Sequence, residues 1–190
     1  MKNPLRNLSL GLVGLVLAGS IYAQEPESRE TETRVQQEER KISYKTSDFS
    51  KDSESVLLAR MIFGEARGCS YLERVAVGYT AINRAKDGKK WNGETVKEAI
   101  LKQKQYSCFN EDDKNREKLI DPEKEDAKSF YECLEVSRRI LSGKEKDPTN
   151  GATHYFNPNI VLPDWAKKLE KIGKIKINDK FSVHEFYREK

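Results

Sequence analysis

Apolar residues along the middle of the chain recur every three or four positions, a spacing typical of amphipathic helices. Asp52 or Ser53 can cap a first helix, and Gly68 ends it. Ser70 followed by Glu73 forms a capping box, in which two backbone donors at a helix start find side-chain acceptors. The pattern therefore predicts two consecutive helices with a short break between them.

Two further helices follow before the pattern changes. Thr95 with Glu98 repeats the capping box for a short helix, and Asp121 opens a longer helix that Gly143 closes. Beyond this point, turn residues separate short β-prone runs, two of which flank Asp179 and predict a hairpin. We predict an α+β fold that is mostly helical, with a small C-terminal β-sheet or hairpin.

The N-terminal quarter of the chain has a different composition. A positive start, an apolar run and small residues near its end predict a secretory signal peptide over residues 1–23, with an uncleaved anchor as the alternative. Residues 24–52 are charged and polar and predict a flexible tether. Residues 53–190 suit a single domain. We expect an exported protein of the periplasm or cell wall, with no stable membrane span after cleavage.

The charges are mixed in sign and say little about partners. Lysine and arginine number 35 and aspartate and glutamate 31, a formal net charge of +4. No basic block is interleaved with aromatic residues, so we expect no nucleic-acid partner. The two histidines lack the spacing of a motif such as HExxH, so we expect no metal and no cofactor. We also expect a monomer.

The chain has three cysteines, at positions 69, 108 and 133. Export implies an oxidising compartment, so one disulfide and one remaining thiol are the simplest arrangement. We predict Cys108 and Cys133 as the pair, because Cys69 lies close to the candidate glutamate described next. The alternative is that all three are free and buried.

Glu65 is the most informative residue, because it shares the apolar face of the first predicted helix with Leu58 and Ile62. It also lies in the last turn of that helix. Burial and the exposed carbonyl groups of a helix C-terminus both disfavour a negative charge, so we expect a raised pKa. A carboxyl group that keeps its proton near neutral pH can act as a general acid. The alternative is an ion pair with Arg60, Arg67 or Arg84.

Five segments resemble the SleB-like cell wall hydrolases, the family of spore cortex-lytic enzymes and their relatives, in a region from about Leu57 to Tyr187. They are "LLARMIFGEARG", "RVAVGYTAINRA", "QYSCFN", "DPTNGATHYFNP" and "HEFYR". The resemblance implies a lysozyme-like, mostly helical domain with a small sheet that cleaves peptidoglycan glycan strands. It also implies that Glu65, in the "EARG" segment, is the catalytic acid.

The resemblance favours a lytic transglycosylase, in which one carboxyl group serves as acid and then as base. The alternative within this chemistry is lysozyme-type hydrolysis, which needs a second carboxylate. The candidates for it lie in loops: Glu111, Asp112, Asp113 and Asp164.

Two alternatives belong to other classes of protein. A wall amidase would use Cys69 or Cys108 as nucleophile and His154 or His184 as base. A non-catalytic peptidoglycan-binding module would need aromatic residues but no acid.

Sugar-binding sites combine flat aromatic faces with polar groups that fix the orientation of the ligand. If residues 153–156 form a strand, Thr153 and Tyr155 share one face, and His154 and Phe156 share the other. The resemblance favours Tyr155, with Thr153 beside it, as cleft residues, and leaves the other two for packing or the rim. The predicted substrate-binding residues are Gln105, Ser107, Phe109, Thr153, Tyr155, Asn157 and Tyr187.

Overall fold

The computed structural model describes residues 43–189. The predicted signal peptide and most of the predicted tether lie outside the described residues. No helix in the described part is long and apolar enough to cross a bilayer.

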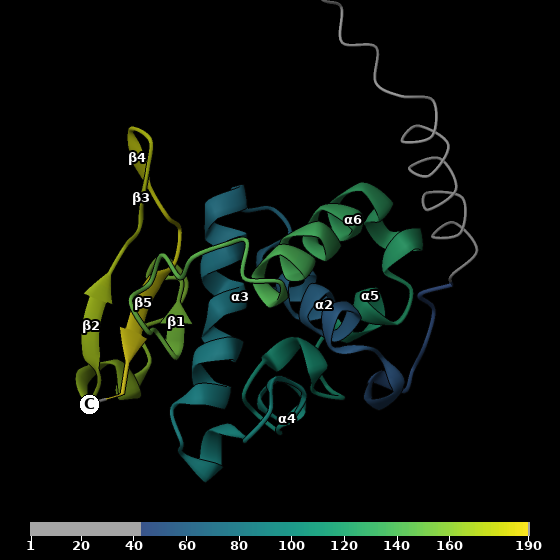
Figure 1. Ribbon diagram of the computed structural model, residues 1–190. Helices are drawn as coiled ribbons and strands as arrows, with labels where there is room; N and C mark the ends of the chain where they lie inside the picture. Colours follow the sequence, from purple (N-terminus) through teal and green to yellow (C-terminus); the bar gives the residue numbers. More distant parts are fainter. Residues whose placement is uncertain (1–42, 190) are drawn as a thin grey trace, which may run out of the picture. The chain divides into compact units, whose positions relative to one another are not determined.

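Five α-helices form one group in the described chain, and α2 lies at their centre. Helix α2 packs against each of the other four. Figure 1 shows α3 between the other helices and the sheet. The helices are α2 (Glu54–Ala66), α3 (Tyr71–Lys86), α4 (Val96–Leu101), α5 (Arg116–Ile120) and α6 (Pro122–Leu141). There are also four short 3₁₀ helices in the described residues: η1 (Phe49–Lys51) before α2, η2 (Lys90–Asn92) between α3 and α4, η3 (Ser107–Phe109) between α4 and α5, and η4 (Asp164–Lys167) beyond α6.

The predicted helix starts are confirmed. The Ser53 hydroxyl accepts a hydrogen bond from the Val56 N–H at the start of α2, and the Ser70 hydroxyl does the same for the Glu73 N–H at the start of α3. Thr95 and Asp121 cap α4 and α6 in the same way. These caps depend only on neighbours within one turn, so the sequence alone predicts them.

A small antiparallel sheet follows α6. Its strand order is β1 (His154–Phe156), β5 (Glu185–Arg188), β2 (Glu170–Gly173). Strands β3 (Lys176–Ile177) and β4 (Lys180–Phe181) form a separate hairpin, which projects from the sheet in Figure 1. The α+β class and the predicted hairpin are confirmed, although β5 serves as the central strand of the sheet and not as an arm of the hairpin.

The packed domain begins before the first long helix. Tyr44 and Phe49, which lie in the predicted tether, are buried in the hydrophobic core. The fully buried Arg60 holds this segment: its Nε donates to Asp52 Oδ2 at 2.6 Å, and its Nη atoms donate to the carbonyl groups of Leu119 and Tyr44. Residues 44–52 are therefore part of the packed domain.

The predicted disulfide between Cys108 and Cys133 is wrong, because all three cysteines, each within the described residues, are free. Cys108 lies on η3 and packs against α2 at Gly64. Cys133 lies in α6, where burial raises the pKa of its thiol to about 12. Each thiol occupies its own buried position, so packing explains both.

Candidate active site

Glu65 is the second-last residue of α2 and lines a cavity of about 350 Å³. The side chain is half-buried, as expected for a residue at the edge of a core. The other lining residues come from α3, the segment around η3, β1 and η4: Arg84, Lys104, Gln105, Tyr106, Ser107, His154, Tyr155 and Trp165. The fold thus brings Glu65 together with three of the predicted substrate-binding residues, Gln105, Ser107 and Tyr155.

Gly64 allows η3 to approach α2 closely beside Glu65. A Cβ atom at this position would lie 2.7 Å from Cys108 Sγ, which is too close for any two such atoms. The approach places the backbone N–H of Cys108 at 3.5 Å from Glu65 Oε1, where it donates a long hydrogen bond. A glycine before the glutamate therefore lets a backbone donor reach the carboxyl group.

Two tyrosines lie close enough to Glu65 to feel its charge. Burial raises the pKa of Tyr155 well above its ordinary value, and the Glu65 carboxylate raises it further. Burial also raises the pKa of Tyr106, whose hydroxyl shares a 3.0 Å hydrogen bond with the Thr80 hydroxyl. Both tyrosines therefore remain neutral at physiological pH.

Arg84 connects two walls of the cavity. Its Nε donates to the Thr153 carbonyl at 2.7 Å, and its Nη1 donates to the Gln105 carbonyl at 3.2 Å. Its guanidinium carbon also lies 4.6 Å from the centre of the Tyr106 ring, a favourable cation–π distance. Arg84 thus holds the segment before η3 and the start of β1 against α3.

No basic side chain in the described part of the chain forms an ion pair with Glu65. Arg60 pairs with Asp52, and the Arg67 guanidinium lies over the Phe63 ring at 5.3 Å. Arg84 donates to backbone carbonyl groups. The ion-pair interpretation of Glu65 is therefore wrong for the described residues, and its carboxyl group faces the cavity.

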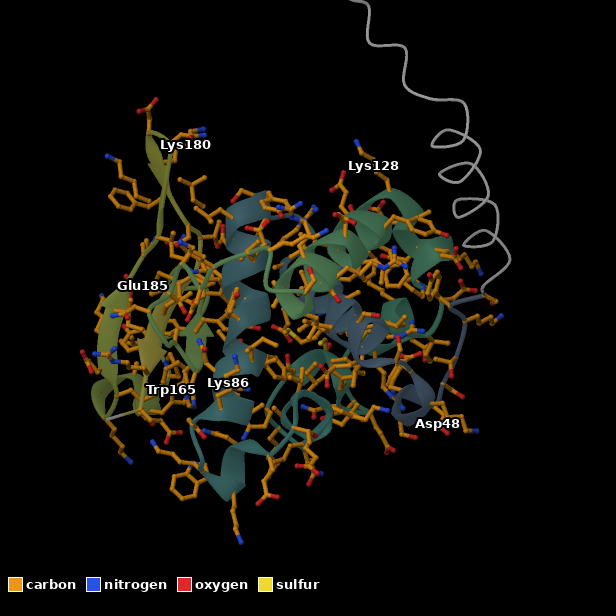
Figure 2. The ribbon with its side chains drawn as sticks, viewed as in Figure 1. Asp48, Lys86, Lys128, Trp165, Lys180 and Glu185 are labelled. Atoms are coloured by element: carbon orange, nitrogen blue, oxygen red, sulfur yellow. The ribbon has the colours of Figure 1, made fainter. Side chains whose placement is uncertain are left out.

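His154 and Trp165 form the sheet side of the cavity. Their ring centres lie 5.1 Å apart, and Figure 2 shows Trp165 among the side chains of the sheet region. Burial lowers the pKa of His154 to about 4, and the positive charge of Arg84 adds to this effect. Trp165 is not among the predicted substrate-binding residues, although a tryptophan in a polar turn is itself a signal for a sugar-binding surface.

Four predicted substrate-binding residues do not line this cavity. Phe109 packs edge-on against Phe49 with ring centres 5.3 Å apart. The Thr153 side chain is buried, and its hydroxyl lies 2.9 Å from His154 Nδ1. The other two have structural contacts of their own.

Asn157 and Tyr187 serve the turn after β1 and the sheet. The Asn157 side chain accepts a hydrogen bond from the Asn159 N–H at 2.9 Å. Tyr187 is buried and stacks on Phe156 with ring centres 5.4 Å apart. These contacts depend on the tertiary fold. The sequence alone therefore could not show that Asn157 and Tyr187 lie outside the cavity.

Glu65 is the one carboxylate that lines this cavity within the described residues. Among the candidates for a second acid, Glu111 and Asp112 line a different cavity beside Phe109. Asp113 accepts a hydrogen bond from the Asn115 N–H, and Asp164 is exposed on η4. The geometry therefore favours chemistry with a single carboxyl group.

The cysteines are poorly suited to the alternative amidase chemistry. Burial raises the pKa of the Cys69 thiol to about 11, and the Glu73 carboxylate adds to this effect. Burial also raises the pKa of Cys108 well above its ordinary value. A cysteine nucleophile needs a lowered pKa, because the thiolate is the reactive form. Neither thiol meets this requirement.

A small α+β domain with one carboxyl group in a polar and aromatic cavity is a candidate glycan-cleaving enzyme, and comparison with known families agrees with this class. The family model described as Cell Wall Hydrolase matches residues 68–181, which is more than half of the chain. The chain belongs to this family. The matched range begins three residues after Glu65, so the role of Glu65 rests on the geometry and on the resemblance of its segment.

Individual relatives are spore cortex-lytic enzymes. The enzyme of Halalkalibacterium halodurans is 27% identical over 130 residues, which are 65% of this chain and 34% of the relative. That of Bacillus cereus is 26% identical over 123 residues, which are 62% of this chain and 41% of the relative. The chain thus spans well under half the length of these relatives.

Two solved structures are similar to this chain. The catalytic domain of the germination-specific lytic transglycosylase SleB from Bacillus anthracis is 22% identical, with a TM-score of 0.49 over 72% of this chain and 96% of that one. The catalytic domain of the Bacillus cereus SleB protein is 21% identical, with a TM-score of 0.48 over 77% of this chain and 98% of that one.

Proposed function

We propose that this protein cleaves the glycan strands of peptidoglycan as a lytic transglycosylase, with Glu65 as general acid and then as base. Membership of the cell wall hydrolase family supports the substrate class. The observation that carries the mechanism is that Glu65 is the single carboxylate lining the cavity in the described chain. A hydrolase of the usual kind places two carboxyl groups on either side of the bond it cleaves.

The reaction needs one proton donor and no external nucleophile. Glu65 donates its proton to the glycosidic oxygen, and the bond between that oxygen and C1 of the muramic sugar breaks, with its electron pair going to the oxygen. The C6 hydroxyl of the same sugar then bonds to C1 and gives its proton to the Glu65 carboxylate. The products are a free sugar hydroxyl and a 1,6-anhydro end, and Glu65 is again protonated.

The cavity supplies what this reaction needs besides the acid. The nucleophilic hydroxyl belongs to the substrate, so the reaction benefits from proximity if the sugar is held in one orientation. Tyr155 and Trp165 offer aromatic faces, and Gln105 and Ser107 offer polar groups. The Cys108 N–H close to Oε1 stabilises the carboxylate after it has lost its proton.

The test is digestion of purified sacculi followed by mass spectrometry of the released fragments. We expect muropeptides with anhydro ends, which are lighter by one water than the reducing products of hydrolysis. Glu65→Gln should lower the digestion rate by about 10²–10⁴-fold, the usual contribution of a general acid. Unchanged digestion by this variant would exclude the mechanism.

Two control variants separate the transglycosylase from the hydrolase. Asp164→Asn and Glu111→Gln remove the exposed acid beside Trp165 and an acid of the neighbouring cavity. Both should digest sacculi at the wild-type rate with anhydro products. Reducing ends from the wild type, together with loss of activity in either variant, would instead indicate hydrolysis with a second carboxylate.

The place of action is also part of the proposal. Peptidoglycan lies outside the cytoplasmic membrane, which agrees with the signal peptide predicted for residues 1–23. The chain covers only part of its spore cortex-lytic relatives, so a role in germination is not proposed.

A further inference from the structure

Three side chains with metal-binding atoms meet at the start of α3. Cys69 precedes the cap residue of this helix, Glu73 lies in its first turn, and His184 lies just before β5. One ligand atom from each residue lies within 4.8 Å of the other two. No other group of three or more such residues occurs among residues 43–189.

The existing contacts already orient two of the three groups. Glu73 Oε1 lies 2.8 Å from His184 Nδ1 and accepts a hydrogen bond from the His184 backbone N–H at 2.9 Å. Glu73 is buried, and Cys69 and His184 are half-buried. The capping box predicted at Ser70 would have the Glu73 carboxylate accept a hydrogen bond from the Ser70 N–H. The carboxylate instead contacts His184, and the local sequence does not explain this difference.

The donor set matches zinc better than a hard cation. Thiolate, imidazole and carboxylate are the three ligand types that zinc uses, whereas calcium and magnesium are bound almost entirely by oxygen. One Zn²⁺ with one thiolate, one carboxylate and one neutral imidazole gives a cluster of zero net charge. A half-buried position therefore holds such a cluster without an uncompensated charge.

One of the three proposed ligands borders a cavity. Cys69 also lines an open cavity of about 670 Å³ between α3 and α6. The nearby positive charge of Arg74 is balanced, because its Nη1 donates to Glu132 Oε2 at 2.5 Å and its Nη2 donates to the Arg67 carbonyl. The basic neighbour is thus engaged in its own contacts.

We propose that Cys69, Glu73 and His184 bind one zinc ion, with the fourth position open to water. The ion would join the start of α3 to the segment that leads into the central strand of the sheet. His184 also contacts Tyr155, with ring centres 5.1 Å apart, and Tyr155 lines the cavity of Glu65. The site therefore stiffens the sheet behind that cavity, and it stands independently of the proposed function.

Cobalt(II) titration of the full chain, without a histidine tag and after treatment with a chelator, tests the proposal directly. A thiolate ligand gives Co²⁺ an intense near-ultraviolet charge-transfer band, and a four-coordinate site gives strong visible bands. We expect saturation at one Co²⁺ per chain, loss of both bands on addition of Zn²⁺, and a higher melting temperature with Zn²⁺. The chain has only two histidines and three cysteines, so few other sites could imitate this result.

Single variants assign the ligands. Cys69→Ser keeps the Glu73–His184 pair and should abolish the charge-transfer band, while Glu73→Gln and His184→Gln should each weaken Zn²⁺ binding by at least about 10–100-fold. Cys133→Ala and His154→Gln are the matched controls, and both should keep the cobalt spectrum. Circular dichroism checks that each variant is folded.

Two outcomes would overturn the proposal. One is a wild-type chain that shows no charge-transfer band and no change in melting temperature with Zn²⁺, as expected if the three residues form only a histidine–glutamate pair beside a thiol. The other is a Cys69→Ser variant with the wild-type cobalt spectrum, which would place the metal elsewhere.

Discussion

The Glu65 carboxyl group has uncharged groups as its described neighbours and forms no ion pair within the described residues. It accepts a hydrogen bond from the Cys108 backbone N–H, and the two tyrosines near it are neutral. Arg84 acts on the same cavity indirectly, because it binds the carbonyl groups of Thr153 and Gln105. At the scale of single residues, the site is therefore one carboxyl group in a cavity. Arg84 fixes the two backbone segments that line this cavity.

Arg84→Lys tests this positioning role. A lysine keeps the charge but cannot donate along two fixed directions, so at least one buried carbonyl loses its partner, at a cost of about 1–3 kcal/mol in the free energy of unfolding. Urea denaturation measures the loss, and sacculus digestion should fall in parallel. Arg139→Lys, at a partly exposed ion pair with Glu145, is the control and should cost less than about 1 kcal/mol. Equal stability of the two variants would contradict the prediction.

His154 makes the stability of the domain depend on pH. The folded-state pKa of about 4 lies below the ordinary value of 6.5 because of burial and then Arg84. The unfolded chain therefore binds the proton first as the pH falls. The contribution of neutral His154 to the free energy of unfolding is fully present above about pH 6.5. As the pH falls from about 6.5 to about 4, the free energy of unfolding decreases by about 2–3 kcal/mol.

The measurement is urea unfolding at a series of pH values for the wild type and for His154→Gln. The difference between the two proteins cancels the contributions of all other ionisable groups. This difference should change steadily between about pH 6.5 and pH 4. A difference independent of pH across this range would show that His154 is not buried as a neutral group.

At the scale of elements, helix α2 and the 3₁₀ helix η3 form the part of the site that holds the acid. Their contact is close only because residue 64 has no side chain. Helix starts follow from local caps, and the sequence predicted them. The contact between α2 and η3 joins segments more than forty residues apart, and no local pattern reports it.

Gly64→Ala should separate these two elements. Its Cβ atom would lie 2.7 Å from Cys108 Sγ and 2.8 Å from Cys108 Cβ, and a cysteine side chain is too short to move away alone. We expect a loss of about 1–3 kcal/mol in the free energy of unfolding, together with reduced sacculus digestion.

Gly68→Ala is the matched control for stability. It lies in the same segment, just after α2, and its Cβ atom would have no neighbour within 4 Å. The melting temperature of this variant should stay close to that of the wild type. A Gly64→Ala variant as stable as Gly68→Ala would mean that η3 does not pack against α2 as described.

At the scale of the whole molecule, residues 44–52 complete the core beside α2 and α5. Arg60 is fully buried and depends on Asp52 and the Tyr44 carbonyl for its charge and hydrogen bonds. The composition of residues 24–52, which are mostly charged and polar, predicted a tether. Tyr44 and Phe49 are buried because the rest of the folded chain supplies the surface on which they pack.

A chain that begins at Ser53 should therefore be much less stable than one that begins at Gln24. Removing Asp52 leaves a buried positive charge without its partner, which typically costs about 3–5 kcal/mol. This is a large part of the roughly 5–15 kcal/mol that stabilises an ordinary domain. Thermal unfolding followed by circular dichroism compares the two chains, and Asp52→Asn in the longer chain tests the ion pair alone. Equal melting temperatures would show that the segment is only a tether.

The sequence by itself determined the helix starts, the mostly helical class with a small C-terminal sheet, and the position of a glutamate in the last turn of the first long helix. These features depend on residues within a turn or two of each other, so composition and spacing report them. Only the tertiary structure decided which residues share the cavity, that Cys108 and Cys133 do not pair, and that Glu73 binds His184. Glu73 and His184 are 111 positions apart, and contacts over such separations follow from how helices and strands pack, which no local pattern encodes.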